Sequence, residues 1–254
     1  MDKRTVKAIK AIVIREVKYG EADKLLNILT RDHGLLTVTA KRASRPKSNM
    51  LYSTSPVTFT EFELSGTEAR RFYVNKASVI EAFMNIKNDV ELLTYAAHLC
   101  DLVLDTAKDI EESREIYSLL LYTLNKLNEE GSDPRLIVHT FELKLLFILG
   151  FTPVLNECVI CGSQDYGDSS KLDFSFTQCG LVCSHKHGPR AGDTVSISKA
   201  TYQCLNYIAD SDIPKIFSYS LSQKACEEVY QLASRYTQER LEKAYTKLKF
   251  LEEL

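Results

Sequence analysis

Residues 24–41 read KLLNILTRDHGLLTVTAK, in which two short apolar runs are separated by Arg31, Asp32, His33 and Gly34. Two runs of strand-forming residues that are joined by a short polar segment with glycine predict a β-hairpin. Three further runs, rich in β-branched and aromatic residues, flank this hairpin and cover residues 5–17, 57–64 and 71–80. Five short strands within 80 residues predict a small closed barrel.

After residue 83 the apolar residues repeat with helical spacing. Asn88 and Glu91, three residues apart, predict a capping pair at the start of a first helix. A second helix is predicted over residues 113–130. Asp133 and Pro134 predict the N-cap and the first residue of a third helix, which is almost wholly apolar and is therefore expected to be buried.

Residues 155–192 interrupt this pattern, because Cys, Gly, Asp and Ser replace the helical spacing. Helical spacing resumes at Ser198, breaks at Pro214 and continues in a long helix that is predicted over residues 221–248. The sequence therefore predicts an α+β protein with three parts. These are a five-stranded barrel, an all-α domain and a small unit inserted into that domain, which cover residues 1–80, residues 81–154 with 193–254, and residues 155–192.

Two groups of cysteines lie inside the predicted insertion. Cys158-Val-Ile-Cys161-Gly is followed by CGLVCSHKH over residues 179–187. Two thiolates two residues apart can bind one tetrahedral ion, and a second group about twenty residues later is typical of zinc sites. The chain has seven cysteines and no export signal, which favours metal over disulfides. We therefore predict a zinc-finger-like module with Cys158, Cys161 and Cys183 as ligands.

Three residues compete for the fourth ligand position: His187, Cys179 and His185. His187 is favoured because a spacing of three residues after the last cysteine is common in such sites. Four protein ligands leave no position for an activated water, so the predicted Zn²⁺ is structural. The other interpretation is that these cysteines are small core residues, as we expect for the three that lie on apolar faces of predicted helices.

Residues 41–49, KRASRPKSN, place four cations within seven residues after the hairpin. A solvated surface loop is one interpretation of this stretch. The other is that the barrel is an oligonucleotide-binding (OB) fold, in which a basic connection between strands contacts phosphates and a neighbouring aromatic ring stacks on bases. On that interpretation the residues predicted to contact DNA are Lys41, Arg42, Arg45, Lys47, Lys7, Arg71 and Tyr52.

The 254-residue chain carries a formal net charge of only −2, but its charge is unevenly distributed. Residues 1–80 contain 15 Lys and Arg against 8 Asp and Glu, whereas residues 81–254 contain 17 against 26. A basic barrel and an acidic remainder indicate different tasks. The glycines fit no phosphate loop, dinucleotide fingerprint or nucleophile elbow, so we expect neither nucleotide-driven chemistry nor the common hydrolase site. Apolar stretches are too short or too interrupted for a signal or a membrane span, which predicts a cytoplasmic protein.

Taken in order along the whole chain, these segments resemble the RecO family of bacterial recombination mediators. The stretches that carry the resemblance are residues 20–26, 29–35, 41–48, 141–153, 158–162, 180–183 and 248–251. Two positions depart from the family pattern. Arg42 stands where the family has a glycine, and Lys186 stands where the family has its last zinc cysteine.

The resemblance implies a non-enzymatic protein of DNA repair and homologous recombination. Such a protein binds single- and double-stranded DNA, anneals complementary strands and, with RecR, helps to load RecA onto DNA coated by single-strand-binding protein. Its implied partners are RecR, the C-terminal tail of single-strand-binding protein and, indirectly, RecA and RecF, at the nucleoid. An alternative is a scaffold whose basic barrel does not bind DNA directly. A metal-dependent nuclease is disfavoured because no carboxylate cluster accompanies the cysteines.

Overall fold

The structure of the chain, a computed structural model, describes residues 6–66, 72–107, 113–166, 171–187 and 192–252. The chain divides into two compact units. The first contains Met1–Ser132 and Thr246–Leu254, and the second contains Asp133–Tyr245. Among the described residues no helix has both the length and the hydropathy that a membrane span requires.

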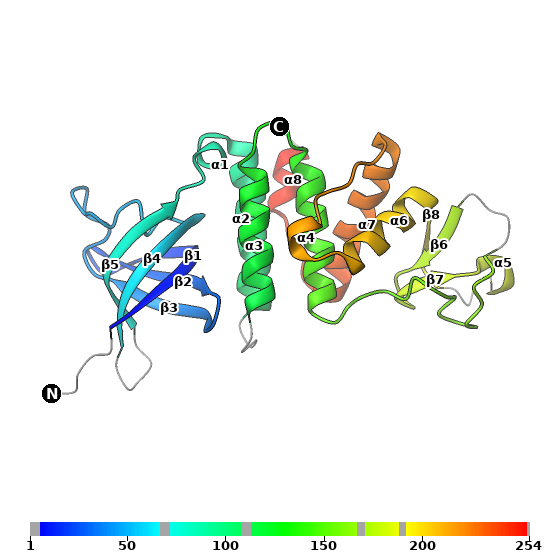
Figure 1. Cartoon of the computed structure of the whole chain (residues 1–254), viewed down its shortest axis with the longest axis horizontal. Helices are drawn as coiled ribbons and strands as arrows, with labels where there is room; N and C mark the ends of the chain where they lie inside the picture. Colours follow the sequence, from blue (N-terminus) through cyan, green and yellow to red (C-terminus); the bar gives the residue numbers. More distant parts are fainter. Residues whose placement is uncertain (1–5, 67–71, 108–112, 167–170, 188–191, 253–254) are drawn as a thin grey trace. The chain divides into compact units, whose positions relative to one another are not determined.

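The first unit begins with a closed five-stranded barrel (Figure 1). Its strands are β1 (Val6–Tyr19), β2 (Asp23–Thr30), β3 (Gly34–Ala40), β4 (Thr58–Gly66) and β5 (Phe72–Glu81). They are hydrogen-bonded in the order β1-β2-β3-β5-β4, and β3 runs parallel to β5 while the other pairs are antiparallel. This confirms the predicted OB-type barrel, and it confirms the α+β class together with the helices that follow.

Strand β1 closes the barrel because it pairs with two neighbours. Its first half pairs with β4 and its second half with β2, and the register shifts between Val13 and Arg15. A bulge of this kind bends a strand and increases its twist, which barrel closure requires. Alternation along the strands then directs one set of side chains inward. The barrel core comprises Ala11, Val13, Leu26, Ile28, Val38, Ala40, Ala43, Phe62, Leu64 and Val74.

In the described part of the first unit, four helices follow the strands: α1 (Met84–Asn88), α2 (Val90–Thr106), α3 (Arg114–Leu127) and α8 (Lys247–Glu252). The predicted capping pair at Asn88 is wrong by one residue. Asp89 is the N-cap of α2, and its carboxylate accepts hydrogen bonds from the amides of Glu91 and Leu92. The carboxylate therefore satisfies two amides that have no partner within the helix.

The second unit combines helices with a small sheet. Its helices are α4 (Pro134–Ile148), α5 (Ser184–His187), α6 (Lys199–Asp210), the 3₁₀ turn η2 (Ile213–Lys215) and α7 (Gln223–Leu241), and its strands β6 (Lys171–Ser175), β7 (Gly180–Val182) and β8 (Thr194–Ser198) pair in the order β7-β6-β8. Asp133 caps α4 and Pro134 occupies its first turn, as predicted. Phe174, Leu181 and Ile197 of the sheet share one hydrophobic core with residues of α4, α6 and α7.

The single long helix predicted over residues 221–248 is wrong. Helix α7 ends at Leu241, and Glu242 takes a left-handed conformation with φ 50°. The chain then forms α8 in the other unit, where the Lys247 ammonium lies 2.6 Å from the Asp101 carboxylate. A left-handed residue ends a helix whatever the helical spacing of the residues beyond it.

Candidate nucleic-acid interface and metal centre

The connection between β3 and β4, residues 41–57, carries the predicted basic loop (Figure 1). The carboxylate of Asp23 accepts a hydrogen bond from the Arg42 amide at 2.7 Å, and the Ser44 amide donates to the Ala22 carbonyl at 2.9 Å. Both bonds join the loop to residues 22–23, where the turn after β1 meets the start of β2. The start of the loop is therefore held by an element that lies nearly twenty positions earlier in the chain.

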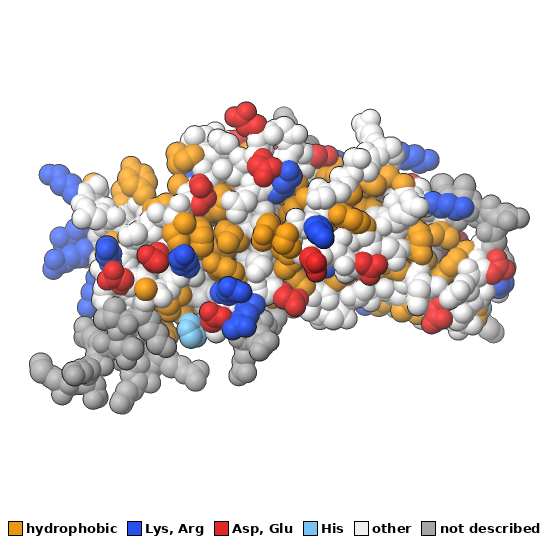
Figure 2. All heavy atoms as spheres, viewed as in Figure 1, with side chains coloured by type: hydrophobic (Ala, Val, Ile, Leu, Met, Phe, Trp, Pro, Cys, Tyr) orange, Lys and Arg blue, Asp and Glu red, His pale blue; other side chains and the backbone are white. Residues whose placement is uncertain are grey.

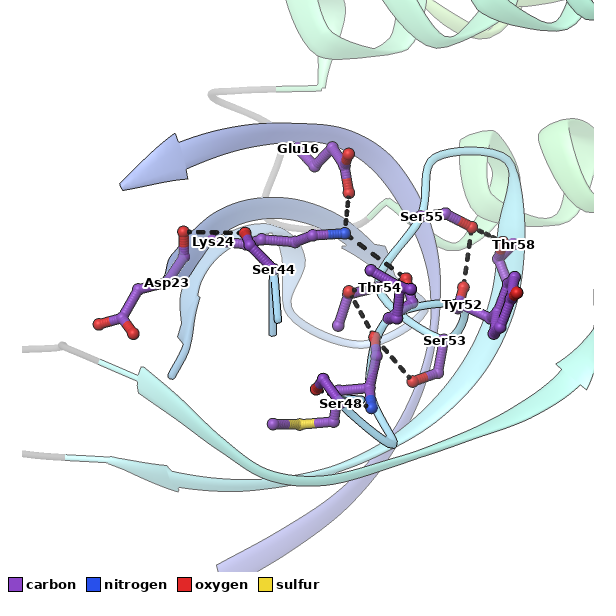
Figure 3. Close-up of polar contacts among 12 residues, drawn as sticks. Glu16, Asp23, Lys24, Ser44, Ser48, Tyr52, Ser53, Thr54, Ser55 and Thr58 are labelled. Carbon is purple, nitrogen blue, oxygen red and sulfur yellow. Dashed lines mark hydrogen bonds and ion pairs between the residues drawn. The ribbon is translucent and has the colours of Figure 1, made fainter. Parts of the chain in front are cut away.

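Lys24 anchors the far side of the same loop from inside the barrel (Figure 3). Its side chain is 9% exposed, and the ammonium lies 2.5 Å from the Glu16 carboxylate and 3.5 Å from the Leu51 carbonyl. The Thr54 hydroxyl donates to the Met50 carbonyl at 2.6 Å. These contacts give the loop a defined course although it contains no strand or helix.

The loop presents its cations to solvent. Lys41, Arg42, Arg45 and Lys47 are all exposed. Figure 2 shows Lys and Arg side chains grouped on the barrel at the end where this loop lies in Figure 1. A cationic surface on a fixed backbone attracts phosphates without ordering a flexible segment first.

The aromatic residues of the barrel and its loop include exposed rings and buried rings. Tyr52 is 79% exposed, and the Lys41 ammonium lies 5.0 Å from the centre of the Tyr73 ring. Phe62 is fully buried in the barrel core. Stacking on a base requires an exposed ring on a basic surface, and Tyr52, one of the residues predicted to contact DNA, provides such a ring.

Two predicted contact residues lie at the edge of what the structure describes. Lys7 lies in β1 opposite Leu64, and its side chain is outside the described part of the chain. Arg71 lies outside the described residues altogether.

The folded chain brings Cys158, Cys161, Cys183 and His187 together. One sulfur or nitrogen atom from each lies within 4.8 Å of the others. The sulfurs of Cys161 and Cys183 are 3.5 Å apart. Two segments position them: the turn after Val154 carries the first two cysteines, and the end of β7 with α5 carries Cys183 and His187.

Backbone amides surround the first sulfur. Burial opposes ionisation of the Cys158 thiol, but hydrogen bonds from the amides of Cys183, Ile160 and Cys161 outweigh it and lower its pKa to about 6. Burial raises the pKa of Cys183 to about 12, and the adjoining sulfurs add to that rise. Because the pKa of one thiol is lowered and that of its neighbour is raised, the pair favours a single negative charge. A bound cation would stabilise a second negative charge.

This set of atoms suits zinc. Three thiols and one imidazole are a common zinc ligand set, and two sulfurs bound tetrahedrally at 2.3 Å lie about 3.8 Å apart. The Nε2 atom of His187 is buried and has no hydrogen-bond partner within the described part of the chain. A metal ion would provide that missing partner.

The other two candidates for the fourth metal ligand are not found in this cluster: Cys179 lies elsewhere, and the side chain of His185 is not among those that the structure describes. The sulfur of Cys179 lies 2.9 Å from a guanidinium nitrogen of Arg240 on α7, and it is not part of the cluster. The side chain of His185 is outside the described residues. Lys186 points its ammonium to the Ser163 hydroxyl at 3.2 Å.

Comparison with known proteins identifies the family of this chain. A family model described as "Recombination protein O N terminal" matches residues 4–83, and one described as "Recombination protein O C terminal" matches residues 87–249. The chain belongs to the RecO family. RecO proteins are non-enzymatic recombination mediators in DNA repair, and this chain is one of them.

Individual relatives agree over nearly the whole length. The DNA repair protein RecO of Acetivibrio thermocellus is 37% identical over 244 residues, which cover 96% of this chain and 95% of that protein. The RecO proteins of Alkaliphilus metalliredigens and Bacillus subtilis are 31% and 28% identical, and the matches cover 89% and 91% of this chain and 90% and 88% of those proteins.

The structure gives a physical reason for the glycine that the RecO pattern has at the position of Arg42. Arg42 adopts the left-handed conformation with φ 58°, which glycine enters without steric cost. Arg42→Gly is therefore expected to raise the free energy of unfolding by about 0.5–1 kcal/mol, since the relieved strain exceeds the entropy that glycine adds to the unfolded chain. Urea unfolding measures this change. Arg45→Gly is the control, and an equal gain there would contradict the explanation.

Sequence reasoning missed the residues that hold the basic loop in place. Asp23 and Lys24 each lie in an ordinary strand pattern, and nothing in their neighbourhood marks them as loop anchors. Their partners are 19 and 27 positions away. Such contacts follow from the register of β2 in the barrel, which no local pattern contains.

Lys24→Met tests this anchoring. The substitution keeps most of the apolar stem but leaves Glu16 without its cation, and we expect the free energy of unfolding to fall by about 1–2 kcal/mol. DNA affinity should fall several-fold as the loop loses its anchor. Urea unfolding and fluorescence anisotropy measure the two effects. Lys10→Met removes the same charge from an exposed site in β1, and an equal loss in that control would contradict an anchoring role.

Proposed function

We propose that this protein binds single- and double-stranded DNA through the barrel surface around residues 41–57 and anneals complementary strands. One observation carries the proposal: four exposed cations project from a loop whose backbone is tied to Asp23 and to the buried Lys24. The contact residues are those predicted from the sequence, namely Lys41, Arg42, Arg45, Lys47, Lys7, Arg71 and Tyr52.

Annealing needs no nucleotide on this account. Two complementary strands repel each other because both backbones are negatively charged, and a cationic surface lowers that repulsion by releasing condensed counterions. An exposed ring such as Tyr52 can hold bases unstacked from their own strand, so that they remain accessible to pairing. The barrel therefore brings strands together without catalysing a covalent step.

Membership of the RecO family supports partners of the RecF pathway. We propose that the protein acts with RecR to load RecA onto DNA coated by single-strand-binding protein, whose C-terminal tail it binds. We place this activity at the nucleoid in the cytoplasm. The division of labour follows the three proposed domains: residues 1–80 for DNA, residues 81–154 with 193–254 for protein partners, and residues 155–192 for zinc.

The metal role that we propose is structural. Cys158, Cys161, Cys183 and His187 would hold Zn²⁺, which would stabilise the fold around it. Four protein ligands leave no open position, so the site would not activate water. The ion would fasten residues 157–163 to the segment that follows β7.

The test is annealing of complementary oligonucleotides by the purified protein without ATP, over a series of salt concentrations. Acceleration that fades as salt rises, and that persists on strands coated with single-strand-binding protein, is the expected result. A folded protein that neither binds DNA at physiological salt nor accelerates annealing would overturn the proposal. It would favour a scaffold whose barrel binds another protein.

A further inference from the structure

The four residues of the metal centre differ sharply in exposure. Cys158 and Cys183 are each 1% exposed, whereas Cys161 is exposed to solvent. The sulfur of Cys161 lies 3.5 Å from that of Cys183. A small oxidant in solution thus reaches one thiol of the cluster first, and a second thiol lies beside it.

We propose that Cys161 is a peroxide-sensitive thiol and that its oxidation joins it to Cys183 in a disulfide that expels the metal. The inference rests on the proposed zinc site and adds a modification site to it. The ligand class is a small hydroperoxide, with hydrogen peroxide as the simplest member.

The chemistry balances in two steps. The Cys161 thiolate attacks one peroxide oxygen, the O–O bond breaks, hydroxide leaves and the sulfur becomes a sulfenic acid. The Cys183 thiolate then attacks the Cys161 sulfur, the S–O bond breaks, and a second hydroxide leaves. Two thiolates lose two electrons in total, and one peroxide is reduced to two hydroxides, which take up protons to give water.

The geometry permits this closure. The two sulfurs must approach from 3.5 Å to the disulfide bond length of about 2.0 Å. They lie in two short segments, the turn before Gly162 and the junction between β7 and α5, which belong to different parts of the chain. The disulfide removes two of the four proposed ligands, and the two that remain, Cys158 and His187, are too few to retain a structural zinc ion.

Three of the four cysteines outside the cluster are poor competitors for the oxidant because they are buried. Burial raises the pKa of Cys100 to about 12 and that of Cys204 to about 11, so both stay as unreactive thiols. Cys226 is also buried. Cys179 is half-exposed and therefore serves as an internal control in the same module.

The structural consequence should be local. Cys158, Val182 and Cys183 form a small core of their own with Val159, Ile160 and Tyr166. The sheet of the module instead shares the larger core of α4, α6 and α7. Loss of the metal should therefore loosen residues 157–166 and 183–187 while β6, β7 and β8 stay folded.

The experiment uses the full-length protein loaded with zinc and treated with increasing hydrogen peroxide. A chromogenic chelator measures released zinc, and peptide mass spectrometry without reduction locates the disulfide. We expect one zinc ion released per Cys161–Cys183 disulfide, and recovery of zinc binding after a thiol reductant and zinc are added. Limiting peroxide with dimedone present should label Cys161 before any other cysteine.

Two variants sharpen the test. Cys161→His keeps a zinc-binding side chain but removes the exposed thiol. In peroxide this variant should release zinc at least about tenfold more slowly than the unmodified protein. Cys179→Ser should behave like the unmodified protein. If Cys161→His does not hold zinc, dimedone labelling of the unmodified protein still decides which thiol reacts first.

The outcomes separate this inference from the proposed metal site. A protein that takes up no zinc overturns the site and the inference with it. Zinc-loaded protein that retains its metal in peroxide, forms a disulfide between other cysteines, or is labelled first at another cysteine overturns the inference alone.

Discussion

Replacing Lys41, Arg42, Arg45 and Lys47 together by glutamine is expected to weaken DNA binding by about 10²–10³-fold at physiological salt. Each cation that neutralises a phosphate releases condensed counterions, and this release supplies most of the affinity of a binder without base contacts. The slope of log K against log salt should fall by about 3, with the smaller change on single strands. Fluorescence anisotropy with labelled oligonucleotides over a KCl series measures both quantities.

The matched control removes four exposed lysines of the second unit: Lys199, Lys215, Lys224 and Lys243. It produces the same change in net charge, so a general electrostatic effect would appear in both variants. We expect the loss of DNA affinity in this control variant to be less than a tenth of the loss in the loop variant. Equal losses would show that overall charge matters rather than the loop, and an unchanged affinity in the loop variant would place the DNA surface elsewhere.

The second large effect is expected at the metal centre, where Cys158→Ser should lower zinc affinity by about 10²–10³-fold. Cys158 is the buried proposed ligand whose sulfur accepts hydrogen bonds from three backbone amides, and serine offers a hydroxyl that zinc binds poorly. At a hundredfold excess of zinc over its dissociation constant the bound ion contributes about 2.7 kcal/mol. Its loss should lower the melting temperature by about 5–10 °C.

Atomic absorption measures zinc per chain, and calorimetry measures the melting temperature before and after chelation. Cys179→Ser is the control, because the sulfur of Cys179 lies against Arg240 and outside the cluster. It should retain one zinc per chain. Zinc retained by Cys158→Ser, or lost from Cys179→Ser, would show that the ligand set is different.

Local sequence patterns were sufficient for most of the secondary structure. The strands of the barrel follow from apolar alternation and β-branched residues, and the start of α4 follows from Asp133 and Pro134. The spacing of Cys158 and Cys161 alone was enough to predict that these two cysteines belong to one cluster. Each of these signals acts over a few residues, through backbone sterics, capping or ligand geometry, and such interactions exist before the chain folds.

Other features depended on contacts between distant segments. His187 lies beside the three cysteines while Cys179 faces Arg240, 61 positions along the chain, and no spacing rule separates those two residues. The buried Lys24 holds the basic loop only because β1, β2 and the loop meet in the barrel. The break at Glu242 likewise follows from where α8 packs, against α2, rather than from its helical spacing. Packing and long-range hydrogen bonds select among local alternatives of similar energy, and they form only when the whole chain has folded.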